Sequence, residues 1–132
     1  MQGHVSNLAY VGWMQDIAIE HSAAAGWSMQ RYLELGAGWV VRSHFIEYLR
    51  PAFADETVSV HTWVPRFDQR STPRRYLFLR DVDKVELAGA ETIWVFVDLT
   101  TGRRRRIPPD LLGSFDPVPE EREVRQTLGL AT

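Results

Sequence analysis

The residues with the clearest potential for chemistry stand where the first predicted helix begins. His4 and Ser6 occur in the run Gly3-His4-Val5-Ser6-Asn7, just before an apolar pattern of helical period. The first turn of a helix presents backbone N–H groups without intrahelical partners at the positive end of the helix dipole. Such groups suit an oxygen on which negative charge develops. His4 is a candidate hydrogen-bond donor to a carbonyl or a water, and a bond to the backbone is the equal alternative.

Arginines form the strongest charge cluster of the chain. Four are consecutive, from Arg103 to Arg106, and four more precede or begin a predicted strand: Arg66, Arg70, Arg74 and Arg75. Guanidinium groups match phosphate oxygens in geometry and charge, so a phosphate-bearing ligand is a candidate partner. A solvated turn is the favoured alternative for the consecutive run. RNA is disfavoured, because the net charge is −2 and no aromatic platform interleaves with the arginines.

Several other chemistries are excluded or disfavoured. The chain has no cysteine, which excludes disulfides, thiol nucleophiles and thiolate metal sites and is consistent with the cytoplasmic location that we expect. His44 and His61 lie on different predicted strands without the spacing of a metal site, so we expect no metal. No serine stands in a GxSxG turn, which disfavours a serine triad.

Length and composition indicate one globular domain. The chain has 132 residues, of which 45% are hydrophobic, enough for a packed core. We expect a single domain over 1–132, with its core at about 3–113 and a charged tail at 117–132. No apolar run approaches the roughly 20 residues that span a bilayer, so we expect no membrane insertion.

The first quarter of the chain predicts two helices. A helix is expected over 7–24, because its apolar residues recur on one broad face, with Ser6 as N-cap and Gly26 as the stop. A short second helix is expected over 28–35, capped by Ser28 and ended by Gly36.

After Gly38 the pattern changes to the period of a strand. Strands are expected over 39–50, 57–64, 75–82 and 91–99, with a polar connection over 66–73. Simple alternation puts one set of first-strand residues on the same side: Trp39, Val41, Ser43, Phe45, Glu47 and Leu49. We expect a bulge or bend at Ala88-Gly89-Ala90, and short helices after Pro108 and over 120–128.

One long helix followed by four or more antiparallel strands predicts an α+β fold in which a curved sheet wraps the helix. Three segments in this order resemble the hotdog-fold acyl-CoA thioesterases of the 4-hydroxybenzoyl-CoA thioesterase branch. They are Gly3-His4-Val5-x-Asn7-x-x-Tyr10, Tyr48-Leu49-Arg50-Pro51-Ala52, and Trp94-Val95-Phe96-Val97-Asp98 leading to Ile107-Pro108. The resemblance covers about residues 3–109 and implies hydrolysis of an acyl thioester.

The resemblance also implies how the site works. It makes the Asn7 amide the catalytic donor to the carbonyl oxygen and puts the catalytic carboxylate four residues before His4, a position that precedes Met1. The family's first strand has no counterpart either. Three alternatives stay open: the natural chain begins further upstream, another carboxylate acts, or the protein binds without hydrolysis. Asp16 is the first candidate for a replacement carboxylate, followed by Glu20 and Glu47, although a solvated or paired role is favoured for each.

The remaining site residues follow from the same resemblance. The acyl group is expected between helix and sheet, against Trp13, Ile17, Val41 and Phe45. Tyr10 is a further candidate contact, for which packing against the sheet is favoured. The coenzyme A arm is expected to extend toward arginines that include Arg74, Arg103 and Arg104. A homodimer or homotetramer is expected, because a lone hotdog sheet leaves an edge unpaired.

The sequence therefore predicts a thioester hydrolase that acts on acyl-CoA or an acyl-carrier protein, with coenzyme A as part of the substrate and no other cofactor. Two alternatives remain. A binder of the same ligands would keep the pocket without turnover, and a hotdog dehydratase would need a His-carboxylate pair for which no motif is visible.

Overall fold

The computed structural model describes residues 6–132, so His4 lies outside the described residues. The fold is α+β and of the hotdog type, as predicted. Its elements are α1 (Asn7–Ala24), α2 (Met29–Leu35), β1 (Ala37–Tyr48), β2 (Val58–Trp63), β3 (Ser71–Arg80), β4 (Glu86–Asp98), α3 (Pro109–Leu112) and α4 (Glu121–Thr127). The four strands form one antiparallel sheet in the order β1-β4-β3-β2.

The first two helices begin and end where the sequence predicts. Ser6 caps α1, with its Oγ accepting from the Ala9 N–H at 3.3 Å. Ser28 caps α2 in the same way, accepting from the Arg31 N–H at 3.2 Å. Gly36 ends α2 at φ +76°, a conformation that glycine adopts without the steric cost of a Cβ.

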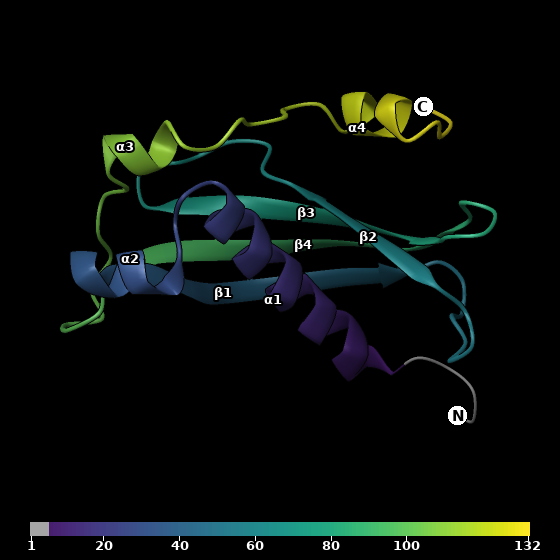
Figure 1. Ribbon diagram of the computed structural model, residues 1–132, viewed down its shortest axis with the longest axis horizontal. Coiled ribbons are helices and arrows are strands. Elements are labelled where there is room, and N and C mark those ends of the chain that lie inside the picture. Colours follow the sequence, from purple (N-terminus) through teal and green to yellow (C-terminus); the bar gives the residue numbers. More distant parts are fainter. Residues whose placement is uncertain (1–5) are drawn as a thin grey trace.

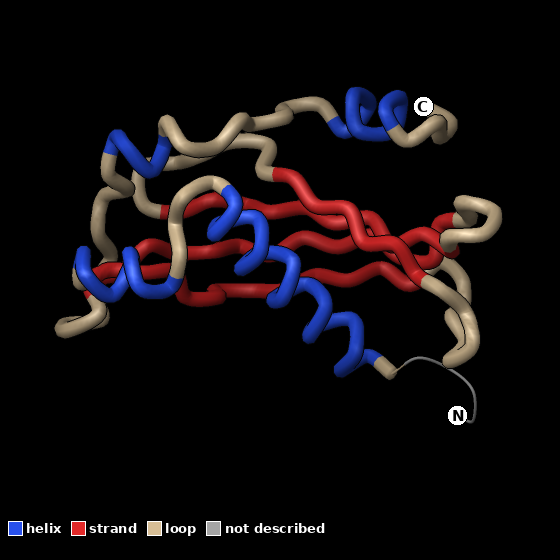
Figure 2. Tube along the Cα trace, in the orientation of Figure 1, coloured by secondary structure: helices blue, strands red, loops and turns tan. Residues whose placement is uncertain are grey.

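Helix α1 runs across one face of the sheet, as Figure 1 shows. Figure 2 shows the four strands as a single curved layer behind it. The apolar side of α1 packs Tyr10 and Met14 against Tyr76 and Phe78 of β3. A second buried cluster lies around Phe96 of β4 and unites residues from separate parts of the chain: Trp27, Tyr32, Ala37, Ile107, Leu111 and Phe115. The core is therefore divided between the two ends of α1.

A β-bulge in β1 changes which residues face the helix. The register passes from Val41 opposite Trp94 directly to Ser43 opposite Ile93, which leaves Arg42 as the extra residue. Directly paired residues of neighbouring strands share a face. Val41 therefore lies on the face of Trp94, whereas Phe45, opposite Glu91, lies on the other face. The prediction that Val41 and Phe45 share a side is wrong, because the bulge inverts the alternation after it.

Strands β3 and β4 begin earlier than predicted. Pro73 lies within β3 rather than in a connection, opposite Ile93 of β4. The pairing of β2 with β3 ends at Trp63 opposite Arg75, so β3 has no β2 partner at Pro73, and proline is tolerated at such an unpaired strand position. The Ala88-Gly89-Ala90 segment pairs continuously with β1. The irregularity of β4 lies directly before it, where the register against β3 shifts and leaves Leu87 as the extra residue, so the predicted bulge is displaced by one residue.

The C-terminal segment contains the two short helices that the sequence predicts. The Val118 N–H donates to the Val64 carbonyl at 2.9 Å, and Arg125 of α4 forms an ion pair with Glu86 at the start of β4. These contacts hold the segment beside the sheet. Across residues 6–132, every helix is too short or too polar to span a bilayer.

Candidate functional site

The start of α1 lies at the surface and has backbone donors without partners among residues 6–132. Ser6 engages the amides of Ala9 and Tyr10 through its carbonyl and that of Ala9 through its Oγ as well. The N–H groups of Asn7 and Leu8 donate to no residue within 6–132, and both residues are exposed. Two amides at the positive end of an 18-residue helix therefore have no acceptor among the described residues.

Tyr10 anchors this end of the helix in the core. Its ring makes edge contacts with Phe78 at 4.9 Å, Tyr48 at 5.2 Å and Trp13 at 5.3 Å between centroids. Only 2% of Tyr10 is exposed, and burial raises the pKa of its hydroxyl. The favoured expectation that Tyr10 packs against the sheet is confirmed, and the aromatic contacts fix the position of the helix start relative to the end of β1.

Asp16 lies one and a half turns further along, in an open groove between α1 and β2. The groove measures about 420 Å³, and its walls include Trp13, Ile17, Glu20 and Glu56. Asp16 is exposed, and Trp13 and Ile17 are half-buried against the core. The groove brings carboxylates together without enclosing them. Within the described residues, no group of His, Asp and Glu side chains is arranged to hold a metal ion.

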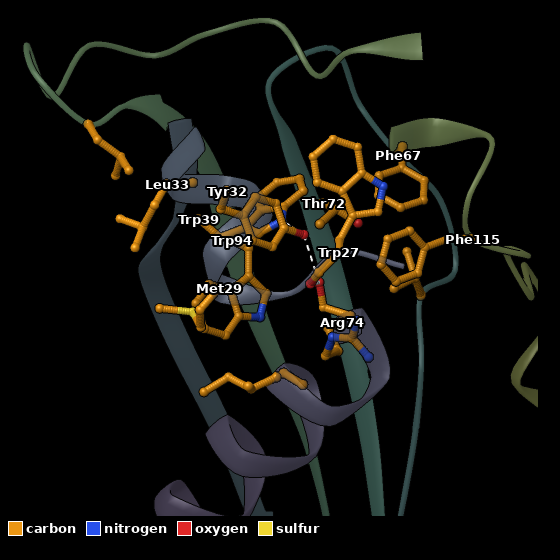
Figure 3. Close-up of a pocket in the computed structure, with 16 residues that line it drawn as sticks. Trp27, Met29, Tyr32, Leu33, Trp39, Phe67, Thr72, Arg74, Trp94 and Phe115 are labelled. Carbon is orange, nitrogen blue, oxygen red and sulfur yellow. Dashed lines mark hydrogen bonds between the residues drawn. The ribbon is translucent and has the colours of Figure 1, made fainter. Parts of the chain in front are cut away.

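A more enclosed cavity lies at the opposite end of α1. It measures about 310 Å³ and is bounded by the last turns of α1, by α2 and by the sheet. Figure 3 shows that its labelled aromatic side chains gather above Arg74. The six aromatic residues of the lining are Trp27, Tyr32, Trp39, Phe67, Trp94 and Phe115. Such a lining suits an apolar ligand that is oriented by few polar groups.

Arg74 is the charged group of this cavity. It projects from β3 on the helix side and is 5% exposed. Its Nη1 donates to His21 Nδ1 at 2.8 Å and to Thr62 Oγ1 at 3.2 Å. An acceptor role for Nδ1 requires neutral His21 with its proton on Nε2. Burial, and then the positive charge of Arg74, lower the pKa of His21, which maintains this state at neutral pH.

The two predicted arginines of the consecutive run lie on an exposed hairpin at the end of β4. Arg104 pairs with Val97, and the Arg103 carbonyl accepts from the Asp98 N–H at 2.9 Å. Gly102 at φ +71° makes the turn, and Asp98 Oδ1 accepts from the amides of Thr100 and Thr101. This hairpin projects Arg103 and Arg104 into solvent, near the start of β1.

Within the described chain the candidate residues therefore form two groups. Asn7 and Tyr10 lie beside Tyr48 at the end of β1, whereas the cavity and the arginine hairpin lie at its start. His21 follows Asn7 by 14 residues on α1, which corresponds to about 21 Å along a helix axis. Phe45 faces away from α1 and is 67% exposed, so it lines neither the groove nor the cavity.

The comparisons with known proteins agree with this architecture. A family model described as the thioesterase-like superfamily matches residues 1–115. The chain belongs to this superfamily. No curated protein matches the chain.

Solved structures match this thioesterase-like chain in fold. A 1,4-dihydroxy-2-naphthoyl-CoA thioesterase from Synechocystis has a TM-score of 0.77 at 15% identity, over 85% of this chain and 82% of that one. A putative oleoyl thioesterase from Lactobacillus plantarum has a TM-score of 0.80 at 24% identity, over 86% and 43%. A hypothetical protein from Staphylococcus aureus, solved with CoA, has a TM-score of 0.80 at 12% identity, over 100% and 78%.

Several residues of the cavity in the thioesterase-like protein are not predicted from the sequence. His21, Trp27, Tyr32 and Phe115 were not among the candidates, although all four contribute to the cavity or to its buried surroundings. Trp27 and Phe115 lie outside regular elements, where no periodicity marks a residue as buried. Large aromatic residues in short connections were the one available signal, because such residues usually find burial.

We expect His21 to make the stability of the thioesterase-like protein pH-dependent. The pKa of His21 is lowered in the folded protein. Below the unfolded pKa of about 6.5, the unfolded chain therefore binds a proton that the folded chain resists, so the free energy of unfolding decreases as the pH is lowered. The urea midpoint should therefore decline less between pH 7.5 and pH 5.5 in His21→Gln than in the wild type. Burial also lowers the pKa of His61, so part of the decline in the urea midpoint should remain in both the wild type and His21→Gln. Equal declines would show that His21 contributes nothing.

Proposed function

We propose that this protein hydrolyses an acyl thioester, with acyl-CoA as the first candidate substrate and an acyl-carrier protein as the second. The observation that carries the proposal is the start of α1, where Asn7 is exposed and its amide donates to none of the described residues. In the reaction, water oxygen bonds to the acyl carbon, the carbon–sulfur bond breaks, and the thiolate takes up a proton. The amide would stabilise the oxygen anion that forms in between.

Membership of the thioesterase-like superfamily supports the reaction, and the names of two fold neighbours support the substrate class. One is a thioesterase for 1,4-dihydroxy-2-naphthoyl-CoA and the other a putative oleoyl thioesterase. The structure of a third neighbour contains CoA, which supports a CoA thioester here as well. The aromatic lining of the cavity provides the apolar surroundings that an acyl group needs. No cofactor beyond the CoA of the substrate is needed for hydrolysis.

A homodimer would bring the two groups of site residues together. Strand β1 is an edge of the sheet and exposes Val40 and Val41 near its start and Phe45 near its end. If two β1 strands pair antiparallel about a two-fold axis, the start of one lies beside the end of the other. The cavity and arginine hairpin of one protomer would then approach the partner's α1 start. We propose this arrangement for the acyl and CoA ends of the substrate.

A substitution of Asp16 tests which carboxylate activates water. Asp16 is the candidate nearest to the α1 start that lines a groove. If Asp16 acts as general base, Asp16→Asn should lower kcat by about 100-fold or more while the protein stays folded. An unchanged kcat would remove Asp16 from the mechanism without affecting the proposed reaction.

The proposed reaction is tested by thiol release from acyl-CoAs with short, long and aromatic acyl groups. We expect turnover well above the rate in buffer for at least one of these acyl-CoAs. Acyl-pantetheine, which lacks the nucleotide of coenzyme A, measured in parallel shows how much that nucleotide contributes to turnover. Binding without thiol release would instead indicate a non-catalytic acyl-CoA protein. Loss of absorbance from an enoyl thioester without thiol release would indicate a dehydratase-type reaction.

A further inference from the structure

Arg74 lines the cavity, and part of its guanidinium has no acceptor among the described residues. The group carries five N–H donors, and its hydrogen bonds of 2.8 Å to His21 and 3.2 Å to Thr62 both start from Nη1. Neither Nε nor Nη2 donates to any residue of 6–132. The Nε–Nη2 edge is one of the two that can hold both oxygens of a carboxylate at once.

The charge of Arg74 is not balanced by a neighbouring carboxylate. Within the described part of the chain, no Asp or Glu oxygen lies within 4 Å of its guanidinium, although Arg75, the next residue of β3, pairs with Glu91 at 3.0 Å. Both partners of Arg74 are neutral, since His21 accepts through Nδ1 and Thr62 through its hydroxyl. Burial lowers the pKa of Arg74, but a guanidinium stays protonated at any working pH. A buried cation with neutral partners alone is costly.

Several other polar groups of the cavity satisfy one another, whereas the indole N–H of Trp94 is buried and has no hydrogen-bond partner among the described residues. Ser22 Oγ donates to the Trp27 carbonyl at 2.9 Å, so its contact of 2.7 Å with Tyr32 is a bond that the tyrosine donates. The Tyr32 oxygen in turn accepts from Trp39 Nε1 at 3.0 Å. The donors of Ser22, Tyr32 and Trp39 are therefore occupied. Arg74 is the group through which this cavity can recognise charge.

The surroundings of Arg74 select the shape of the ligand. Exposed apolar side chains of Ile19, Met29, Leu33 and Leu99 form the rim, so the cavity opens to the surface through them. Arg74 lies deeper, and Figure 3 shows aromatic rings between it and the rim residue Leu33. A ligand whose acidic group contacts the guanidinium would therefore have apolar and aromatic side chains around the rest of its body. A multiply charged phosphate would lose more hydration here than a single carboxylate, and one guanidinium would offset only part of that cost.

We propose that this cavity binds a carboxylate on a compact, ring-containing apolar body, with the carboxylate against the free edge of Arg74. Two sources have this chemistry: a free aromatic acid, and an acyl thioester whose acyl group carries a second, distal carboxylate. This replaces the expectation that Arg74 holds the phosphates of coenzyme A. The inference concerns binding and does not require that the protein hydrolyse a thioester.

Isothermal titration of the full chain with 2-naphthoate and with its neutral counterpart 2-naphthamide tests the proposal. We expect naphthoate to bind about tenfold tighter or more, the usual effect of a hydrogen bond to a charged group. Arg74→Met should remove this preference. Arg75→Gln, altered at the next residue on the opposite face of β3, should retain it. If Arg74→Met does not fold, Arg74→Lys should still bind naphthoate but with a reduced preference, because a lysine lacks the fork.

Three results would overturn the proposal: equal binding of the two probes, binding of neither, or a preference that survives in Arg74→Met. Competition then identifies the source. The monothioester of an aromatic dicarboxylic acid with pantetheine should displace naphthoate if the cavity holds a distal acyl carboxylate. If this thioester fails to compete, the free acid is the ligand. Thiol release measured on the same samples keeps the outcome separate from that of the proposed hydrolysis.

Discussion

Asn7→Pro should lower kcat for the preferred thioester by about 100- to 1,000-fold, which is the usual effect of removing one donor to an oxygen anion. Proline removes the one backbone N–H that we propose as this donor. The helix itself should tolerate the change, because Asn7 is the first residue of α1, where proline is favoured and no intrahelical bond is lost. Ser6, at φ −75° and ψ 156°, already has the extended conformation that the residue before proline requires.

The control for this prediction changes the same side chain and keeps the amide. Asn7→Ala should retain kcat within a few-fold, and both variants should unfold at nearly the wild-type temperature. Steady-state thiol release with the substrate found in the acyl-CoA screen measures the effect. Equal activity of Asn7→Pro and Asn7→Ala would exclude the amide from catalysis, and an equal loss in both would assign the role to the asparagine side chain.

Phe96→Ala should reduce the free energy of unfolding by about 3–5 kcal/mol, the usual cost of deleting a buried aromatic ring. Phe96 is fully buried, and its ring makes an edge contact with Trp39 at 4.9 Å between centroids. It also joins β4 to α3 and to the loop that carries Trp27. The loss would be a large part of the 5–15 kcal/mol that stabilises a typical domain.

Phe45→Ala is the matched control, since Phe45 lies on the opposite face of the sheet and is 67% exposed. In a monomer its effect should stay within about 0.5 kcal/mol. Urea unfolding followed by tryptophan fluorescence measures both variants. A Phe96→Ala loss as small as that of Phe45→Ala would contradict the assignment of Phe96 to the core. A large, concentration-dependent loss in Phe45→Ala would indicate that this face is buried in a dimer.

Local signals in the sequence were sufficient for the helices. The bounds of α1 and α2 follow from an apolar pattern of helical period together with Ser6, Ser28 and Gly36. Each of these residues acts on backbone groups within a few positions of itself, so its effect is visible in a short stretch of sequence. The order of the strands and the resemblance to hotdog thioesterases then predicted the fold class correctly.

The strands and the cavity depended on contacts between distant residues. Arg42 becomes a bulge only through the register of β1 against β4, and Pro73 belongs to a strand because β2 ends before reaching it. The placement of Arg74 beside His21 joins β3 to the last turn of α1, 53 residues apart. The sequence alone determined the elements, the caps and the family. The tertiary structure decided which residues share a face and which charge is enclosed, because both depend on pairing and burial between segments that are not neighbours in the chain.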